Sequence, residues 1–287
     1  MFDSLEQARE AATEFIADEH LDEAMKVLRP GIGLRPTAPD SPSVVGGSRL
    51  GGEPDLPGGI DWPRPELGSL PYAFICQIDC TEAHALGELA ADLPDHGRIL
   101  VFYDVQLGED GDAARAAHVL WDDTAADQLH TATMPDDLAE AAAHGTGGGD
   151  GYPPDCYHSE ARPLTLFRGV TPPGNDDPVL DAFMESPVSD GWEDEFGMFA
   201  MECGVFITPD WRHHQLLGAP QQEQYNPRED MELQPDDTVC DWRLLLQLSL
   251  PDWQAEDFGE GSVYFLIRTD DLAHRRFDRV QAVYQQT

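Results

Sequence analysis

The sequence predicts a β-rich α+β fold with largely antiparallel sheets, built from an internally duplicated strand-connection-strand unit and preceded by an N-terminal helix. Three observations lead to this expectation. A helical pattern occurs at the start of the chain, and short apolar segments typical of strands follow it. The same pattern of residue types occurs twice among these segments, once in each half of the chain. With 41% hydrophobic residues among 287, the chain can bury a substantial core.

Residues 1–29 are expected to form a helical segment. Ser4 and Gln7 have the spacing of a capping box. Apolar residues then recur at helical spacing, namely Leu5, Ala8, Ala12, Phe15 and Ile16. We expect a break near residues 18–20 and a second short helix over residues 21–28, which Arg29-Pro30-Gly31 would end.

Residues 30–71 contain nine prolines and three Gly-Gly pairs. Such a composition excludes helix and argues against a central strand, because proline donates no backbone hydrogen bond. The stretch nevertheless carries Leu56 and Trp62, which favour burial. We therefore expect an ordered meander that lies across the core.

The remaining residues complete one domain, which we expect to span residues 30–287. Apolar runs predict strands at residues 72–80, 98–104, 117–121, 163–170, 243–250 and 262–268. Residues 175–185 are expected to be helical, with Asn175 as N-cap, and residues 270–276 to form a helical turn. Residues 122–158, rich in Asp, Ala and Gly, are expected to be a surface insertion.

An internal repeat is the most informative feature of the sequence. In the first half Phe74–Asp79 precedes Gly97–Phe102, and in the second half Leu244–Ser249 precedes Gly261–Leu266. Each unit has an apolar triplet, a glutamine, an apolar residue and a small polar residue, followed by a connection, a glycine and an apolar strand. We expect two pseudo-repeats, at about residues 46–121 and 214–280, related by a local two-fold axis.

The two glutamines, Gln77 and Gln247, are polar residues in strongly apolar strands. A buried amide needs partners for its donors and its acceptor. One interpretation is that each glutamine hydrogen-bonds the backbone of a Gly/Pro-rich loop, and we favour it. The other is that both line a cleft between the repeats. That cleft would be a ligand-binding site, and its candidate residues are Gln77, Gln247, Trp62, Arg49, His214 and Gln224.

At these residues the sequence resembles the YwqG-like family. The resemblance covers about residues 30–287 and is carried by Gly51–Pro57, Trp62-Pro63, Gln77-Ile78, Leu93–Gly97, Phe102–Asp104, His214–Pro220, Gln224, Leu244–Leu248 and Gly261–Phe265. It implies a cytoplasmic, β-rich α+β domain of unknown function, and it implies no reaction. Residues 122–158 match no motif of the family.

The motifs of common catalytic and cofactor sites are missing from the sequence. It has no Gly-x-Ser-x-Gly elbow, no phosphate-binding loop with a lysine and no complete Gly-x-Gly-x-x-Gly. On a strand, Cys76 and Cys80 would lie about 13 Å apart, too far for one zinc ion. We therefore expect no cofactor and no metal.

Two polar groups have both a functional and a structural interpretation. Gly46–Arg49 could form a nest for an anion, or a turn in which Arg49 pairs with a carboxylate. Of His213 and His214, one could act as a general base with Asp79 or a nearby Glu, or both could be satisfied by local backbone. We favour the structural interpretation in each case.

The charge balance excludes some partners. Lys and Arg number 17 against 55 Asp and Glu, a net charge of −38, which argues against nucleic-acid binding and against docking onto anionic lipid. The N-terminus shows no secretory signal, no apolar run reaches about 18 residues, and five cysteines are an odd number. We expect a cytoplasmic protein, with the acidity an organism-wide trait rather than a binding site. A salt-rich cytoplasm is one explanation of that trait.

The function that we expect is that of a non-enzymatic module that binds a small molecule or a protein in the cleft between the repeats. Three alternatives stay open. One is an enzyme of unrecognised type, hydrolase-like, that uses His214 and a carboxylate. Another is an immunity or antitoxin-type protein whose acidic surface attracts a basic protein partner. In the third, the duplication has a purely structural role and the function lies in residues 122–158.

Overall fold

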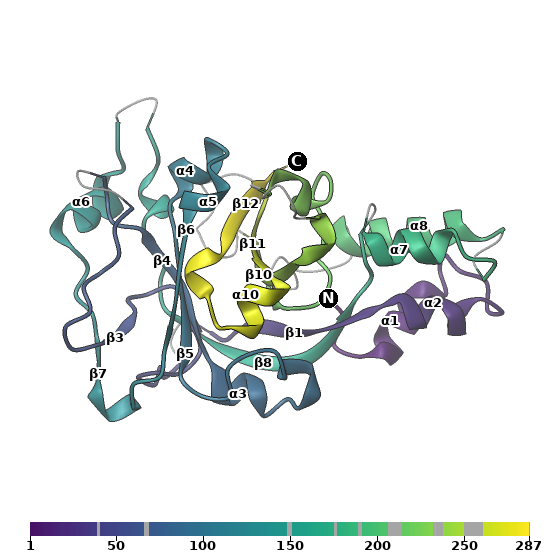
Figure 1. The fold of residues 1–287 in the computed structure, drawn as a ribbon, viewed down its shortest axis with the longest axis horizontal. Helices are drawn as coiled ribbons and strands as arrows, with labels where there is room; N and C mark the ends of the chain where they lie inside the picture. The colour runs from purple at the N-terminus through teal and green to yellow at the C-terminus, as the bar shows by residue number, and fades with distance from the viewer. Residues whose placement is uncertain are drawn as a thin grey trace.

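Ten strands form one antiparallel sheet in the order β12-β11-β10-β9-β1-β8-β2-β4-β5-β6, and β3 and β7 form a second, two-stranded sheet (Figure 1). The computed structural model describes residues 1–38, 41–65, 69–147, 151–174, 177–188, 191–205, 214–231, 233, 238–249 and 261–286. The β-rich α+β class predicted from the sequence is confirmed.

The strands are β1 (Arg29–Pro36), β2 (Arg49–Leu50), β3 (Asp55–Pro57), β4 (Ala73–Asp79), β5 (Arg98–Tyr103), β6 (Ala117–Asp122), β7 (Leu129–Thr131), β8 (Arg162–Thr171), β9 (Gln215–Leu216), β10 (Trp242–Ser249), β11 (Ser262–Arg268) and β12 (Gln281–Gln285). The helices are α1 (Leu5–Ala12), α2 (Leu21–Val27), α3 (Cys80–His84), α4 (Val105–Glu109), α5 (Ala113–Ala116), α6 (Asp136–His144), α7 (Pro178–Met184), α8 (Glu193–Val205) and α10 (Thr269–Ala273). Short 3-10 turns include η6 (Pro227–Asp230), η7 (Val239–Asp241) and η8 (Phe277–Arg279).

The expectation that residues 30–71 contain no central strand was wrong for β1, which pairs with β8 and β9 at the middle of the sheet. The reason is the register of its prolines. Pro30 lies opposite Val170, whose N–H and C=O both bond Phe2, and Pro36 lies opposite Leu164, whose N–H bonds Ser48. These partners direct their backbone N–H groups away from β1, so β8 requires no N–H from either proline.

The strands are arranged symmetrically about the central pair β1–β8: on each side a two-residue strand is followed by three longer strands. On one side follow β2, β4, β5 and β6, and on the other β9, β10, β11 and β12. Arg49 pairs with Gln77 as Gln215 pairs with Gln247, and β4 and β10 each carry a bulge two residues before the glutamine. After the short strands, Gly51 N–H bonds Ile75 C=O at 2.8 Å and Leu217 N–H bonds Leu245 C=O at 3.1 Å.

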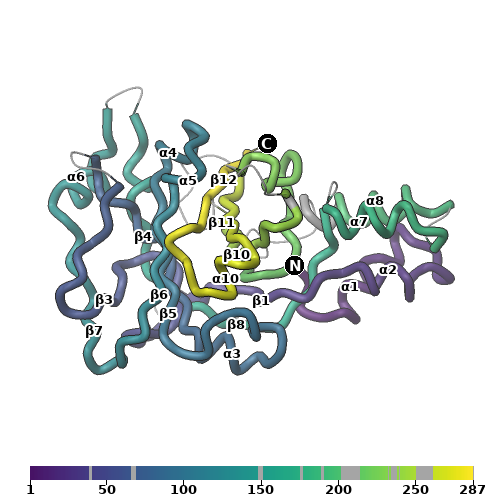
Figure 2. Tube along the Cα trace, viewed as in Figure 1, coloured from purple at the N-terminus to yellow at the C-terminus, as the bar shows by residue number. Residues whose placement is uncertain are grey.

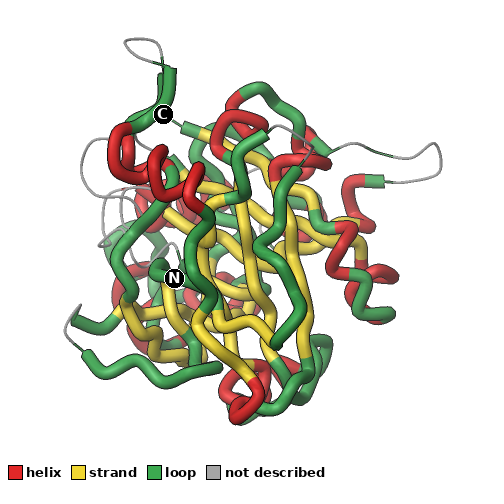
Figure 3. Tube along the Cα trace, turned by 90° about the vertical axis from the view of Figure 1, so that its left-hand side faces the viewer, coloured by secondary structure: helices red, strands yellow, loops and turns green. Residues whose placement is uncertain are grey.

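The sheet encloses the main hydrophobic core between its two groups of outer strands. In this core Tyr103 of β5 meets Phe265 of β11 with ring centroids 5.9 Å apart. A separate apolar cluster covers the outer face of each group, one with Leu100 and Phe102 and the other with Tyr264. Figure 3 shows the strands gathered in the middle of the molecule with the helices at its periphery.

Four helices pack together beyond one end of the sheet. Helices α1 and α2 lie beside α7 and α8, which are distant in the sequence (Figures 1 and 2). The predicted N-terminal helix is confirmed, with Ser4 Oγ accepting a bond from Gln7 N–H. Helix α7 is capped by Asp177, and Asn175 lies outside the described residues. No described helix combines the length and apolar character needed to cross a membrane.

The segment expected as an insertion, residues 122–158, contributes a strand to the two-stranded sheet and side chains to the main core in its described part. Strand β7 pairs with β3, and α6 buries Leu138 and Ala141 in the main core. Cys156 is buried in the same core. Cys76, Cys80, Cys156 and Cys240, the cysteines whose side chains are described, are free thiols.

Gly97 and Gly261 directly precede β5 and β11, and both have a positive φ that favours glycine. This requirement for glycine can be tested. A Cβ on Gly97 would lie 2.4 Å from Asp122 O, and one on Gly261 would lie 2.3 Å from Gln285 O. We predict that Gly97→Ala lowers the free energy of unfolding by about 2 kcal/mol or more, because the clash is with backbone and adds to the cost of a positive φ.

Gly111→Ala is the matched control for urea denaturation. Gly111 also has a positive φ, but no atom lies within 4 Å of a Cβ there. We expect that variant to lose about 1 kcal/mol at most. Equal losses in the two variants would contradict the steric argument.

Candidate functional site

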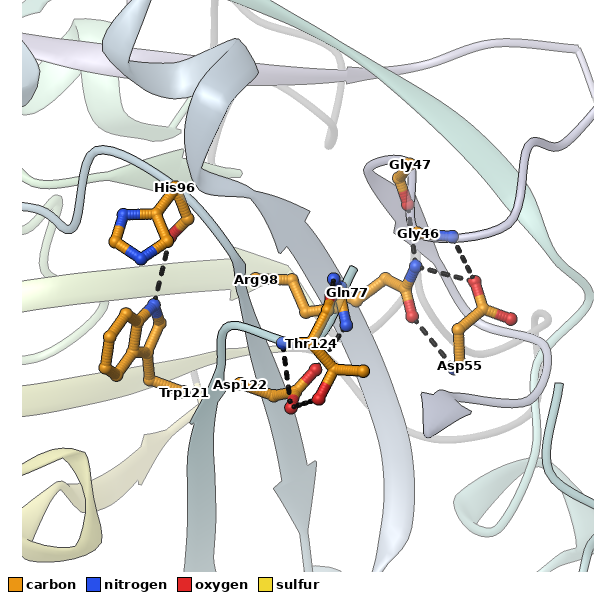
Figure 4. A network of polar contacts seen from close by, with 9 residues as sticks. All are labelled: Gly46, Gly47, Asp55, Gln77, His96, Arg98, Trp121, Asp122 and Thr124. Atoms are coloured by element: carbon orange, nitrogen blue, oxygen red, sulfur yellow. Dashed lines mark hydrogen bonds and ion pairs between the residues drawn. The ribbon is translucent and has the colours of Figure 1, made fainter. Parts of the chain in front are cut away.

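Gln77 fixes the Gly/Pro-rich loop of the first half to the outer face of β4 (Figure 4). Its side chain is fully buried. Its Oε1 accepts a bond from Asp55 N–H at 3.0 Å, and its Nε2 donates to Gly47 C=O at 2.8 Å and to the Asp55 carboxylate at 2.9 Å. These are the contacts that the first of our two interpretations of the glutamines predicts.

Gln247 has the same role in the second half. It is fully buried, its Oε1 accepts a bond from Gln221 N–H at 2.9 Å, and its Nε2 donates to Gln221 C=O at 2.9 Å. Gln77 lies opposite Leu100, and Gln247 lies opposite Tyr264, so each amide faces the outer cluster of its own half. The structure therefore does not bring the two glutamines into one cleft, because the main core fills the space between the halves.

Arg49 is buried and pairs with Asp55 at 2.6 Å. The glycine-rich turn does hold an anion, since Gly46 N–H donates to the same carboxylate at 2.7 Å, but that anion belongs to the chain itself. Burial acts to raise the pKa of Asp55, while hydrogen bonds from Arg49 and Gly46 outweigh it and lower the pKa to about 2. In the second half the uncharged Gln215 and Gln221 occupy the matching places.

The other candidate residues are also placed by the structure. His214 is buried, and its Nδ1 accepts a bond from Ser249 N–H at 3.1 Å. His213 lies outside the described residues. Trp62 is half-buried and donates its indole N–H to Tyr72 C=O at 2.8 Å. Gln224 is exposed and lines a groove described below.

Figure 4 also shows a polar contact at the edge of the sheet. Arg98 of β5 donates to the Asp122 carboxylate and to Thr124 C=O, and Trp121 donates its indole N–H to His96 C=O at 3.1 Å. Every donor named here has a protein acceptor. This network therefore holds the β5–β6 corner together.

A pocket of about 440 Å³ that the sequence did not indicate lies where β1, α7 and β10 begin. The residues that line it come from widely separated segments, among them Arg29, Asp177, Gly218, Arg228, Cys240 and Trp242. Arg29 opens β1, Asp177 caps α7, Arg228 lies in η6, and Trp242 opens β10. The topology alone brings these residues together.

Arg29, Arg228 and Trp242 bring hydrogen-bond donors to the pocket, and the side chains of two of them, Arg29 and Trp242, lack an acceptor in the described chain. Arg228 Nε donates to Trp242 C=O at 2.8 Å, and its Nη1 donates to the Asp177 carboxylate at 3.2 Å. The indole N–H of Trp242 is buried and bonds no atom of the described residues. Arg29 makes no ion pair or hydrogen bond through its guanidinium with any part of the chain that the structure describes.

The first half contains a matching arrangement at Trp62 and Tyr72, and there both hydrogen-bond donors have acceptors within the protein. Trp62 and Arg228 each stand thirteen residues after the residue that pairs with the strand glutamine. Trp62 donates to Tyr72 C=O as Arg228 donates to Trp242 C=O, both at 2.8 Å. The Tyr72 hydroxyl, however, bonds Arg115 C=O at 2.9 Å, whereas the Trp242 indole bonds nothing described.

These observations define a β-rich α+β domain with a ten-stranded and a two-stranded antiparallel sheet, two amide-anchored loops and a donor-lined pocket. Comparison with known families gives its place among proteins. The chain belongs to DUF1963, a domain of unknown function, whose family model matches residues 48–285. No curated protein matches the chain. The match begins after β1, although β1 lies at the centre of the sheet.

The buried pair Arg49–Asp55 gives a stability prediction. Arg49→Gln or Asp55→Asn alone should lower the free energy of unfolding by about 3–5 kcal/mol, because each leaves a buried charge without its partner. The double variant, which resembles the uncharged Gln215 and Gln221, should lose at least about 2 kcal/mol less than the sum of the single losses. Urea denaturation measures all three.

The exposed pair Arg64–Asp137 supplies the control for this cycle. Its atoms are 2.8 Å apart, but both side chains reach solvent. The corresponding variants should show a coupling of about 1 kcal/mol or less. Additive losses at Arg49 and Asp55 would show that burial does not couple these charges.

The lowered pKa of Asp55 gives a pH prediction. Its pKa falls from 3.8 to about 2 on folding, so the unfolded chain takes up the proton first as the pH decreases. The stabilisation is complete above about pH 5 and is lost as the pH falls through about 2. The difference in unfolding free energy between wild type and Asp55→Asn should shrink by about 2 kcal/mol between pH 5 and pH 2. A difference that stays constant would contradict the assignment.

Proposed function

We propose that this protein is a binding module for a small anionic ligand that carries a carboxylate or phosphate group, held in the pocket where β1, α7 and β10 begin. The observation that carries the proposal is the convergence of unpaired donors. The buried Trp242 indole N–H and the Arg29 guanidinium both line this pocket and lack acceptors in the described chain. An anionic oxygen supplies the acceptor that each donor lacks.

The scarcity of basic residues strengthens this argument. With 55 carboxylates to 17 basic residues, arginines have an excess of possible partners. Each of the other arginines that the structure describes has a hydrogen-bond, ionic or ring partner. Arg29 therefore differs from them, and its position in a pocket beside Arg228 favours an external anion as its partner.

The buried indole adds an energetic reason. A buried donor without an acceptor costs about 1–3 kcal/mol, and a ligand oxygen that accepts its hydrogen bond removes this cost. Trp242 is only 3% exposed, so water reaches it poorly. The matched Tyr72 hydroxyl of the first half is satisfied by the protein itself. The difference between the halves supports a ligand role for the second.

We also infer that the two groups of strands descend from one duplicated unit, and that the chain is a YwqG-like protein of the cytoplasm. The mirrored strand order, the matched bulges in β4 and β10 and the matched Gln77 and Gln247 support the duplication. The free thiols and the sequence motifs support the other two inferences. After duplication, the first half kept its donors paired within the protein, and the second half acquired the pocket with its unpaired donors.

Isothermal titration with inorganic phosphate, acetate and succinate in a chloride-poor buffer tests the binding. We predict that at least one of these anions binds, that Arg29→Gln weakens its binding by about 10-fold or more, and that Trp242→Phe weakens it by several-fold. Arg64→Gln removes the same charge from an exposed surface pair and should leave the affinity within about 2-fold.

Alkylation of Cys240 provides a second measurement. Cys240 is exposed and lines the pocket, whereas Cys76, Cys80 and Cys156 are buried. In a Cys203→Ser background, the anion that binds should slow the reaction of Cys240 with iodoacetamide. Binding that is equally strong in the Arg29→Gln variant, or absence of binding by every anion of the series, would overturn the proposal.

A further inference from the structure

A second groove, of about 510 Å³, lies at the seam between the two halves of the domain. One wall comes from α4 of the first half and includes Glu109. The other comes from the second half and includes Gln224, Tyr225 and Asp230 near η6, and Gln285 of β12. It shares no lining residue with the anion pocket, so it is an independent site.

The groove offers acceptors where the anion pocket offers donors. Glu109 and Asp230 supply carboxylates, and no Lys, Arg or His is among the described residues that line the groove. The Tyr225 hydroxyl already donates to Asp230, at 2.8 Å to the nearer oxygen, and the Tyr284 hydroxyl donates to Gln286 at 2.8 Å. The two tyrosines therefore use their hydroxyl protons within the protein.

Gln285 distinguishes this groove from the acidic surface in general. Its side chain is 2% exposed, and its Nε2 donates to Tyr225 C=O at 3.1 Å. Its Oε1 is buried and receives no hydrogen bond from the described chain. The amide is thus held in place by one end while its acceptor end lacks a donor. A carboxylate-rich surface alone would not produce a buried acceptor of this kind.

We infer that this groove binds an ammonium or guanidinium group. These cations carry only N–H donors and no acceptor, which matches the free Gln285 oxygen and the two carboxylates. The rings of Tyr225 and Tyr284 add a surface on which a cation is attracted by the aromatic quadrupole. An anionic group is repelled by Glu109 and Asp230. The cation belongs either to a free small amine or to an arginine or lysine side chain of a basic protein.

Titration calorimetry with two matched probes tests the inference on the full chain. N-acetyl-argininamide carries the guanidinium, and N-acetyl-citrullinamide has nearly the same shape without the charge. We expect the arginine probe to bind about 10-fold more tightly or better. Glu109→Gln should weaken its binding about 5-fold, whereas Asp123→Asn, which removes an exposed carboxylate that does not line the groove, should change it less than about 2-fold.

The outcomes distinguish the two sources of the cation and can contradict the proposal that this groove binds a cation. Equal affinity for the blocked tripeptide Gly-Arg-Gly supports a protein side chain as the source, and binding of the single residue alone supports a small amine. Equal effects of Glu109→Gln and Asp123→Asn would show attraction by net charge only and would overturn the site. So would equal affinity for the arginine and citrulline probes. Arg29→Gln should not alter this binding, so the result is independent of the anion pocket.

Discussion

One buried side-chain amide on the outer face of each half-sheet holds the loop on which the rest of the fold depends. The segments around β2 and after β9 contain proline and left-handed residues, so the backbone groups beside these two strands lie outside the ten-stranded ladder, although Asp55 pairs with β7 in the small sheet. Gln77 and Gln247 each supply an acceptor and a donor that replace the missing ladder partners. Strands β2 and β9 are only two residues long, yet they join the central strands to the outer ones. The amides therefore reinforce junctions that have only two residue pairs on each side and a few adjoining backbone bonds.

The strands that carry the repeat could be predicted because both their faces are apolar. Strands β4, β5, β10 and β11 are buried along nearly their whole length, and a run of apolar residues is sufficient to indicate them. Strand β1 could not be predicted in the same way. Whether Pro30 and Pro36 fit a central strand depends on the register with β8, and the space above Gly33 is filled by Phe167 from the partner strand. Both facts belong to the tertiary structure.

The sequence favoured candidate residues that are polar within apolar surroundings, and four of them proved to be satisfied within the protein. Gln77, Gln247, Arg49 and His214 are all buried and hydrogen-bonded, as expected where an unpaired polar group would be costly. A ligand needs groups that the protein leaves unpaired, and pairing cannot be read from a single sequence. Arg29, Arg228 and Trp242 have no shared spacing, because three distant segments bring them together. The excess of acidic over basic residues was the only signal in the sequence that bears on them.

The large negative charge imposes opposite requirements on the two proposed sites. An anion approaching a chain of net charge −38 is repelled at long range, and salt shortens that repulsion to about 3 Å at 1 M. The contacts inside the anion pocket are made at bonding distance and are screened far less. High ionic strength therefore weakens the repulsion that opposes filling of this pocket. For the groove at the seam, the same salt removes the long-range attraction that any cation would feel. Selectivity there must come from the buried oxygen of Gln285 and the adjacent carboxylates, because only groups at contact distance still distinguish one cation from another.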